Sequence, residues 1–548
     1  MLKTKILPSA DEAYAYPLLI KRILNDSLKY NPENEIVYRD ISRYNYFELN
    51  KRVRKLANVL ETLGVQAGDT VAVLEYDTPR YLELFFAVPM IGAVLHTVNY
   101  RLSPDQVLYT MNHAEDKIVF TNTDFLPLMK GIKSRLKVSA PCVLMSDEEV
   151  FSEIDVPISG NYEELMTRAS DVYEFPDFEE NSVATMFYTT GTTGNPKAVY
   201  FTHRQLVLHT LAGALIFGSY DSICRFRSGD VYMPITPMFH VHAWGVPYIA
   251  TLIGVKQVYP GRYEPEMLLR LLLTEKVTFS HCVPTILHML VSSPVAKAVD
   301  LSHWKVVIGG SALPAGLAKA AIELGIDVIT GYGMSETCPI LSLTYLDDKK
   351  KELSIDDQVS IRTKTGIPIP LVDMKVVDER MKPMPPDGES VGEIVCRSPW
   401  LTQSYYKEEE RSGDLWKGGY LHTGDVAFVD EENFFTITDR IKDVIKTGGE
   451  WISSLEIENL ISTHQSVSEV AVVGIPDARW SERPYAIVVL KEEAETKPEA
   501  LIKYMQKFVD KGVINKWAIP SRIDIVATIP KTSVGKIDKK RIRAEFKK

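Results

Sequence analysis

The string Tyr188-Thr-Thr-Gly-Thr-Thr-Gly-Asn-Pro-Lys-Ala-Val199 places two glycines and four threonines before a single lysine. Glycine lets a backbone turn tightly and come close to a ligand. Threonine hydroxyls, backbone N–H groups and the charge of Lys197 together suit a phosphate group. The string is not a Walker A loop, because the pattern GxxxxGK[ST] is absent. We therefore expect a phosphate-binding loop here, with a polar surface turn as the alternative.

Helical and strand patterns alternate along most of the chain on both sides of this string. Tyr46–Leu63 has helical periodicity, and a second helix is expected to begin at Pro79 with Thr78 as its N-cap. Short apolar runs predict strands at 70–74, 117–120, 304–308 and 327–330. This alternation predicts an α/β fold.

The pattern changes twice toward the C-terminus. From about Gly366, strands at 374–377, 392–396 and 434–438 alternate with Pro- and Gly-rich turns, which predicts a β-rich subdomain. After this, helices at 454–461 and 497–508 accompany strands at 467–473 and 485–490, which predicts a compact α+β unit. We therefore expect a large N-terminal domain at 1–438 and a small C-terminal domain at 439–548.

The composition is that of an ordinary globular protein. Hydrophobic residues make up 45% of the 548 positions and charged residues 24%, which excludes disordered, collagen-like and coiled-coil chains. A net charge of −10 argues against nucleic acid or an anionic membrane as a partner. The five cysteines form no CxxC pair and no secretory signal is evident at the N-terminus, so a cytoplasmic location is expected.

The stretch Val231–Val255 is long enough to span a bilayer and contains no Asp, Glu, Lys or Arg. However, it contains three prolines and two histidines, whose polar and unpaired backbone groups would be unmatched in lipid. We therefore expect a buried strand, turn and helix, and no integral membrane segment.

Further short strings of unusual composition occur along the rest of the chain. In order, they are Gly309-Gly-Ser-Ala312, Gly331-Tyr-Gly-Met-Ser-Glu-Thr337, Tyr420-Leu-His-Thr-Gly-Asp425, Asp439-Arg-Ile-Lys-Asp443, Lys446-Thr-Gly-Gly-Glu-Trp-Ile-Ser453 and Pro530-Lys-Thr-Ser-Val-Gly-Lys536. Taken singly, most of them are compatible with structural turns.

Together with the first string, this ordered series resembles the signature motifs of the adenylate-forming superfamily, which includes acyl-CoA synthetases, luciferases and adenylation domains. The resemblance covers nearly the whole chain. It implies that residues 1–438 form an AMP-binding adenylation domain and that residues 439–548 form a mobile lid.

The resemblance implies ATP and Mg²⁺ as ligands of these motifs. Tyr332 is expected against the adenine, Ser335 at a phosphate, Asp425 at the ribose, Arg440 at the ribose or a phosphate, and Glu336 at Mg²⁺. Ser335 replaces the usual threonine and keeps its hydroxyl. The full set of expected nucleotide-binding residues is Thr189, Thr190, Gly191, Thr192, Thr193, Gly194, Lys197, Gly310, Ser311, Ala312, Gly331, Tyr332, Gly333, Ser335, Thr337, Asp425, Arg440 and Lys442.

The C-terminal motifs imply a hinge, a coenzyme A site and a catalytic lysine. Lys442 occupies the hinge position of the family, and Asp439 stands where glycine is commoner, which we expect to alter hinge stiffness. The loop 446–453 resembles the one that lines the pantetheine tunnel, so Gly448, Gly449, Glu450 and Trp451 are assigned to coenzyme A. By the same resemblance, Lys536 is the catalytic lysine.

The segment Thr236–Gly245 matches the carboxylate site of the family. His240 is expected beside the reacting carboxylate, where amino-acid-activating relatives have Asp, so an amino acid substrate is disfavoured. Trp244 matches an aromatic residue at the tunnel mouth of fatty-acid-activating relatives. The expected acid-site residues are His240, Val241, Trp244, Gly309 and Gly333, and the expected catalytic residues are Lys536, Glu336 and His240.

The resemblance implies an AMP-forming ligase that joins a carboxylic acid to coenzyme A through an acyl-adenylate. A medium- or long-chain fatty acid is expected. Short hydroxy acids such as 4-hydroxybutyrate, branched acids and aryl acids remain alternatives, as do a carrier-dependent adenylation enzyme, a luciferase-like oxygenase and a non-catalytic nucleotide sensor. A homodimer is one expected assembly.

Overall fold

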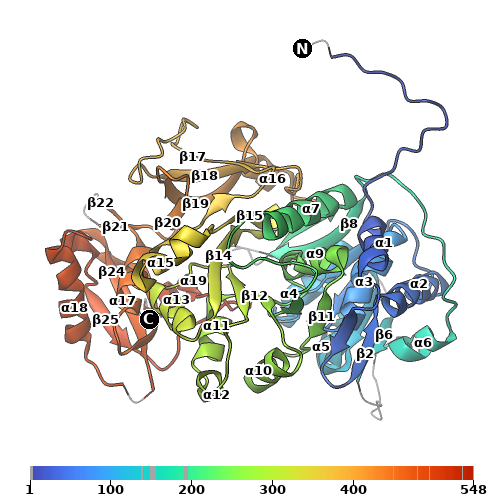
Figure 1. Ribbon diagram of the computed structural model, residues 1–548, viewed down its shortest axis with the longest axis horizontal. Helices are drawn as coiled ribbons and strands as arrows, with labels where there is room; N and C mark the ends of the chain where they lie inside the picture. The colour runs from blue at the N-terminus through green and yellow to red at the C-terminus, as the bar shows by residue number, and fades with distance from the viewer. Residues whose placement is uncertain are drawn as a thin grey trace.

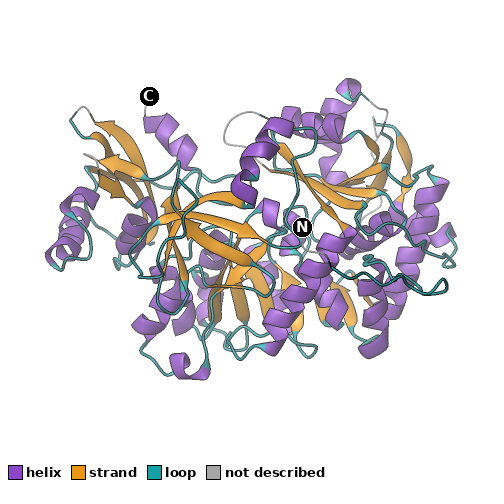
Figure 2. Cartoon of the chain, turned by 90° about the horizontal axis from the view of Figure 1, so that it is seen from above, coloured by secondary structure: helices purple, strands orange, loops and turns teal. Residues whose placement is uncertain are grey.

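The computed structural model describes residues 4–137, 140–147, 156–189, 195–447, 450–477, 479–492, 494–533 and 535–546. Within them, two large mixed sheets, a four-stranded sheet and a smaller C-terminal sheet are flanked by helices (Figures 1 and 2). The predicted α/β fold, with a large N-terminal part and a small C-terminal part, is confirmed.

The first large sheet is parallel except at its last strand. Its strand order is β7 (Ile158–Asn161), β6 (Cys142–Met145), β5 (Asp116–Asn122), β3 (Thr70–Leu74), β4 (Val94–Thr97), β8 (Val183–Thr189) and β9 (Lys197–Thr202). The antiparallel pair β8 and β9 flanks the Thr/Gly string, so Thr189 and Lys197 lie opposite each other in the register.

The second large sheet has parallel strands at its centre and antiparallel strands at both edges. Its order is β16 (Ile367–Pro368), β15 (Ile340–Leu343), β14 (Asp327–Gly333), β13 (Lys305–Ile308), β12 (Phe279–Cys282), β10 (Val231–Pro234), β11 (Lys256–Tyr259), β1 (Glu35–Tyr38) and β2 (Ser42–Asn45). Because β10, β12, β13 and β14 run parallel, the segments that follow them meet at one sheet edge, where ligands of α/β folds commonly bind.

The four-stranded sheet and the C-terminal sheet follow. The four-stranded sheet is antiparallel, in the order β17 (Asp373–Val377), β18 (Gly392–Arg397), β19 (Leu421–Val429) and β20 (Phe435–Arg440). The C-terminal sheet has the order β22 (Glu450–Ile452), β21 (Ile445–Thr447), β24 (Ser481–Leu490) and β23 (Val467–Asp477), with β25 (Arg522–Ile525) paired to β24. The domain boundary at 438 stays a prediction; β20 extends past it.

Helices cover the sheets as the sequence periodicity predicts. The described helices are α1 (Lys21–Tyr30), α2 (Tyr46–Thr62), α3 (Pro79–Met90), α4 (Pro104–Ala114), α5 (Leu126–Ile132), α6 (Tyr162–Arg168), α7 (His203–Ser219), α8 (Val241–Trp244), α9 (Val246–Ile253), α10 (Pro265–Thr274), α11 (Pro284–Val291), α12 (Pro294–Lys297), α13 (Ala315–Glu323), α14 (Asp348–Lys351), α15 (Ile355–Arg362), α16 (Glu409–Leu415), α17 (Ser454–Ser462), α18 (Pro498–Asp510) and α19 (Lys539–Phe546).

Two sequence predictions about helices are confirmed in detail. Thr78 caps α3 by accepting the Tyr81 N–H, and Pro79 occupies its first turn. The uncharged stretch 231–255 forms β10, α8 and α9 inside the protein. Among the described residues, no helix combines the length and apolar character that crossing a bilayer requires.

The connection between β20 and α17 is anchored by Asp439. Its side chain is 2% exposed, and its Oδ2 atom accepts hydrogen bonds of 2.7 Å from both the N–H and the hydroxyl of Ser454. Burial raises the pKa of this carboxyl, while the nearby Lys539 ammonium opposes the shift. The residue at the expected glycine position thus ties the end of β20 to the first turn of α17.

Candidate functional site

A cavity lies at the carboxyl edge of the second large sheet. It measures about 540 Å³, including its mouth. The residues lining it are Phe217, His240, Val241, Trp244, Val246, Phe279, His281, Val307, Gly309, Gly310, Gly331, Tyr332, Gly333, Met334, Ser335, Pro339, Ile340, Leu343 and Lys536. The cavity therefore brings together segments from 217 to 536, including every residue assigned to the acid site.

Lys536 reaches this cavity from the C-terminal unit. Its turn is closed by Thr532, whose N–H donates to the Lys536 carbonyl at 2.7 Å and whose hydroxyl accepts from the Lys536 N–H at 3.2 Å. Burial lowers the pKa of the Lys536 ammonium to about 8, and the nearby Arg440 guanidinium lowers it further. Asp425 and Glu336 act in the opposite direction.

Two glycines allow the close approaches that shape the cavity. A Cβ atom on Gly333 would lie 1.8 Å from the Pro339 carbonyl oxygen, so no other residue fits there without moving backbone. Gly310 has a φ of +78°, and a Cβ there would lie 3.1 Å from Cε of Lys536. The Gly309–Gly310 turn therefore leaves room for the lysine side chain.

The segment that carries His240 is anchored by hydrogen bonds between two of its backbone groups and side chains of other segments. The Met238 N–H donates to Oδ1 of the buried Asp77 at 2.9 Å, and the Thr97 hydroxyl donates to the Phe239 carbonyl at 2.9 Å. Burial, together with the charges of Lys536 and Arg101, lowers the pKa of His240 to about 3. The His240 imidazole is therefore neutral at pH 7.

The residues after His240 form one turn with left-handed backbone. All four residues of α8, Val241 to Trp244, have φ between 47° and 59°. Such a conformation is unfavourable for residues with a Cβ, and surrounding packing must hold it. The Trp244 ring lies 5.0 Å from that of His281, which is fixed by Tyr232 at 2.8 Å and Thr236 at 3.1 Å.

The residues assigned to the nucleoside meet beside the cavity. The Tyr332 hydroxyl donates to Oδ2 of Asp425 at 2.7 Å, and Nε of Arg440 lies 3.3 Å from Oδ1 of the same carboxylate. Asp425 and Arg440 are directly paired between β19 and β20. The predicted grouping of these three side chains is therefore present in the structure.

Tyr405 connects Lys197, which the sequence analysis assigned to the phosphates, with Glu336, which it assigned to Mg²⁺. Its hydroxyl donates to Oε1 of Glu336 at 2.7 Å, and Nζ of Lys197 lies 4.4 Å from its ring centroid. No spacing in the sequence indicated Tyr405, because its partners are far away along the chain. Among the described residues, no group of three or more His, Cys, Asp or Glu side chains is arranged to hold a metal.

Some predicted residues stand apart from the cavity lining. The Thr337 hydroxyl is buried and bonds within its own turn, to Met334 and Pro339. Ser311 and Ala312 are exposed beyond Gly310, and Lys442 is exposed after β20. Seven assigned residues lie outside the described residues: Thr190, Gly191, Thr192, Thr193, Gly194, Gly448 and Gly449. For Glu450 and Trp451 only the backbone, in β22, is described.

The cavity lining also includes aromatic residues that the sequence did not single out. Phe217 and Phe279 pack edge to face with centroids 5.4 Å apart. Behind them, Phe226 stacks on Phe279 at 4.3 Å, so the wall is backed by a second ring. The same lining includes Lys536 and the glycine turns.

The C-terminal unit is docked on the large domain by a set of polar contacts. Thr285 donates to the Gly535 carbonyl at 3.1 Å, and Ser468 hydrogen-bonds Nε2 of His288 at 2.9 Å. The Ala315 N–H donates to the Asn459 side chain at 2.8 Å. This docking places Lys536 at the cavity.

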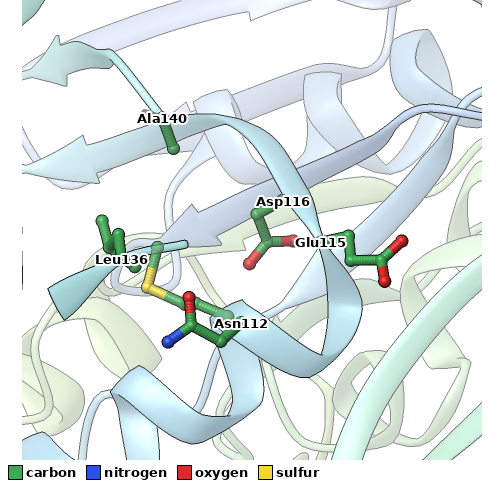
Figure 3. A pocket seen from close by; sticks show the side chains of 6 residues that line it. Asn112, Glu115, Asp116, Leu136 and Ala140 are labelled. Carbon is green, nitrogen blue, oxygen red and sulfur yellow. The ribbon is translucent and has the colours of Figure 1, made fainter. Parts of the chain in front are cut away.

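A second, smaller hollow lies at the end of α4 and contains none of the predicted site residues (Figure 3). The Asp116 carboxylate in this hollow lies 2.9 Å from Nδ1 of the buried His96, so this carboxylate already has a hydrogen-bond partner within the protein. We assign no ligand to this hollow.

Comparison with known proteins gives the family. Residues 24–406 match the family described as AMP-binding enzyme, and residues 456–536 match the AMP-binding enzyme C-terminal domain. The chain belongs to the AMP-binding enzyme family. It is an AMP-forming acid–thiol ligase, as the resemblance implied.

Relatives within this family share nearly the full length. A long-chain-fatty-acid–CoA ligase of Thermus thermophilus is 41% identical over 511 residues, covering 93% of this chain and 91% of the relative. A 3-methylmercaptopropionyl-CoA ligase of Ruegeria lacuscaerulensis is 36% identical, covering 97% and 98%. The crystal structure of the anthranilate CoA ligase AuaEII with anthranoyl-AMP shares the fold, with a TM-score of 0.85, 23% identity and coverage of 97% and 98%.

Proposed function

We propose that this ligase joins a medium- or long-chain fatty acid to coenzyme A through an acyl-adenylate, and releases AMP and pyrophosphate. The observation that carries the proposal is the polarity of the cavity. Its lining combines the polar side chains of Lys536 and His240 with the aromatic pair Phe217 and Phe279. An acid with an apolar tail suits such a lining, because burial of the tail contributes about 0.8 kcal/mol per methylene.

In the first half-reaction, a carboxylate oxygen attacks the α-phosphorus of ATP and pyrophosphate leaves. Two anions have to approach each other, so positive charge placed in advance lowers the barrier. Lys536 is the group we assign to this role. The neutral His240 ring flanks the carboxylate without adding a competing charge, since its low pKa keeps it deprotonated.

ATP is held, in this proposal, by Tyr332 of the cavity lining, by Asp425 and Arg440 beside it, and by the loop that follows Thr189. Tyr332 lies against the adenine, and Asp425 accepts from the ribose hydroxyls with Arg440 beside it. The Thr/Gly loop and Lys197 hold the phosphates. Of the described carboxylates, Glu336 is the one we assign to Mg²⁺, an ion that suits one carboxylate plus ATP phosphates and that would neutralise phosphate charge.

In the second half-reaction, the thiol of coenzyme A attacks the adenylate carbonyl and AMP leaves. We assign the loop 446–453 to coenzyme A. Delivery of this loop requires the C-terminal unit to rotate about Lys442, which withdraws Lys536. We propose a cytoplasmic location, which the five free and buried cysteines support. The homodimer stays a prediction.

The test is pyrophosphate release with Mg-ATP across linear acids from acetate to octadecanoate, with and without coenzyme A. The series should include 4-hydroxybutyrate, 3-methylmercaptopropionate and benzoate. Coenzyme A-dependent turnover that peaks between hexanoate and hexadecanoate supports the proposal. A peak on the short or aryl acids overturns the substrate class, and release without coenzyme A dependence overturns the thioester step.

A further inference from the structure

The loop between β4 and α4 touches the turn that carries Lys536. The Asn99 side-chain N–H donates to the Ser533 hydroxyl at 3.2 Å, and Nη1 of Arg101 donates to the Ser533 carbonyl at 3.2 Å. Asn99 also accepts the Arg101 N–H at 3.0 Å, so one turn of the large domain presents both groups. Ser533 lies three positions before Lys536.

Arg101 also contacts the segment that ends at His240. Its guanidinium carbon lies 5.8 Å from the Phe239 ring centroid and 5.7 Å from the Tyr100 centroid, within the range of cation–π attraction. Its charge acts on the neighbouring His240 in addition to burial and the charge of Lys536. One side chain therefore touches both the acid side of the cavity and the catalytic turn of the C-terminal unit.

We propose that Arg101 is a positioning residue that holds the Lys536 turn against the Phe239–His240 segment and thereby stabilises the orientation in which adenylate forms. This assignment of a step rests on the proposed function. The contact joins two parts of the chain that separate when the C-terminal unit rotates. Its loss therefore disfavours this orientation and leaves the other unaffected.

The geometry distinguishes Arg101 from a general structural cation. The Arg101 guanidinium donates to the backbone carbonyl of Ser533. This acceptor stays available whatever side chain is at position 533. The planar guanidinium can lie over Phe239 while one nitrogen donates, whereas a lysine ammonium offers no such plane. We therefore expect Arg101→Lys to restore only part of what Arg101→Ala loses.

The kinetic experiment separates the two half-reactions in the full chain. ATP–pyrophosphate exchange measures adenylate formation, and thioester formation is followed from supplied acyl-adenylate and coenzyme A. Arg101→Ala is expected to lower exchange by roughly 10- to 100-fold, the range of one charged hydrogen bond, and to leave the second step within about twofold. Arg204→Ala, which removes an arginine paired with Glu180 at 2.6 Å, serves as the matched control.

A structural readout tests the same proposal without any substrate. In the double variant Asn99→Cys and Ser533→Cys, mild oxidation traps the docked orientation as a disulfide, and Arg101→Ala added to this background should reduce the trapped fraction severalfold. The five native cysteines are buried and contribute little background.

Equal loss of both half-reactions in a folded Arg101→Ala protein overturns the proposal, and so does an unchanged trapped fraction. If the wild-type protein uses no fatty acid, the proposed function fails, yet the trapping experiment still decides the role of Arg101. If Arg101→Ala does not fold, Arg101→Lys takes its place, with a smaller loss expected in the same direction in both measurements.

Discussion

The hydroxyl of Tyr332, at the end of β14, donates a 2.7 Å hydrogen bond to Oδ2 of Asp425 in β19. The two residues belong to different sheets and lie 93 positions apart. This hydrogen bond fixes the orientation of the Asp425 carboxylate, and Nε of Arg440 lies 3.3 Å from its other oxygen. A carboxylate held from both sides can accept hydrogen bonds without reorganising, as its proposed role at the ribose requires.

Removing this bond should weaken ATP binding. Tyr332→Phe is expected to raise the KM for ATP by roughly 2- to 10-fold, since one neutral hydrogen bond contributes about 0.5–1.5 kcal/mol. Steady-state kinetics at saturating acid measures it. Tyr485→Phe, which removes a comparable 2.8 Å bond to Asp524 in the C-terminal unit, should leave the KM unchanged. A KM for ATP that does not move in Tyr332→Phe would contradict the assignment of Asp425 to the ribose.

Lys536→Ala should separate the two half-reactions. Loss of a preorganised positive charge is expected to slow adenylate formation by at least about 100-fold. Thioester formation from supplied acyl-adenylate should change by less than about threefold, because Lys536 is withdrawn in that step. The control is Lys531→Ala, which removes a lysine of the same turn paired with Glu469 at 2.9 Å. Equal losses in both steps would show that Lys536 has another role.

The pH dependence of the first half-reaction should reveal the lowered pKa of Lys536. The ammonium is the active form, so kcat/KM should fall as pH rises through about 8, the pKa of this group before ATP binds. The thioester half-reaction should lack this decline. ATP–pyrophosphate exchange between pH 6 and 10, about the range in which the ammonium titrates, is the measurement. A decline that persists in the residual activity of Lys536→Ala would assign it to another group.

The aromatic wall should limit the length of the acid. Phe217→Ala opens space in the cavity. Each methylene that enters this space is expected to lower the activation free energy by about 0.8 kcal/mol, which raises kcat/KM roughly fourfold. The preferred acid should therefore become longer. Phe434→Ala removes a buried ring outside the cavity lining and controls for general loss of stability. An unchanged preference in a stable Phe217→Ala variant would place the end of the tail elsewhere.

Buried histidines should make the fold sensitive to acid. Both ring nitrogens of His242 are buried without a hydrogen-bond partner among the described residues, and burial lowers its pKa from 6.5 to about 3. Between these values the unfolded state binds the extra proton, so the free energy of unfolding falls as pH falls below about 6.5.

His242→Asn removes this titration, and asparagine tolerates the left-handed backbone at this position. The slope of unfolding free energy against pH should decrease by up to about 1.4 kcal/mol per pH unit. Urea unfolding at several pH values measures it. The wild-type protein, measured in parallel, provides the reference slope. An unchanged slope in His242→Asn would mean that His242 keeps its proton on folding.

Much of the fold and the motif grouping was predictable because the signals are local. Strand Thr70–Leu74 and the cap of α3 depend on a few adjacent residues, and both agree with the structure. Each motif is a contiguous string, so the family's order of strings indicated which segments meet. Where the strings fall on described residues, Tyr332, Asp425 and Lys536 do lie around one site.

The remaining site residues were not predictable because their roles come from long-range contacts. Tyr405 meets Glu336 across 69 positions, and Arg101 meets Ser533 across 432. Phe217 and Phe279 form the cavity wall only because α7 and β12 are packed together. A ring or a guanidinium on a helix or loop has no local signature that separates such a role from ordinary packing.

Asp439 links the strand before the proposed hinge to the helix after it. If the C-terminal unit rotates about Lys442, as proposed, α17 has to leave its place on β20 and both hydrogen bonds from Ser454 to this carboxylate have to break, because Asp439 precedes Lys442 and Ser454 follows it. Each catalytic cycle that includes this rotation then contains a step in which hydrogen bonds within the protein break and no substrate atom takes part. A rotation of a whole domain displaces solvent, so where this step limits the cycle we expect turnover to slow in viscous media even when every reactant is saturating.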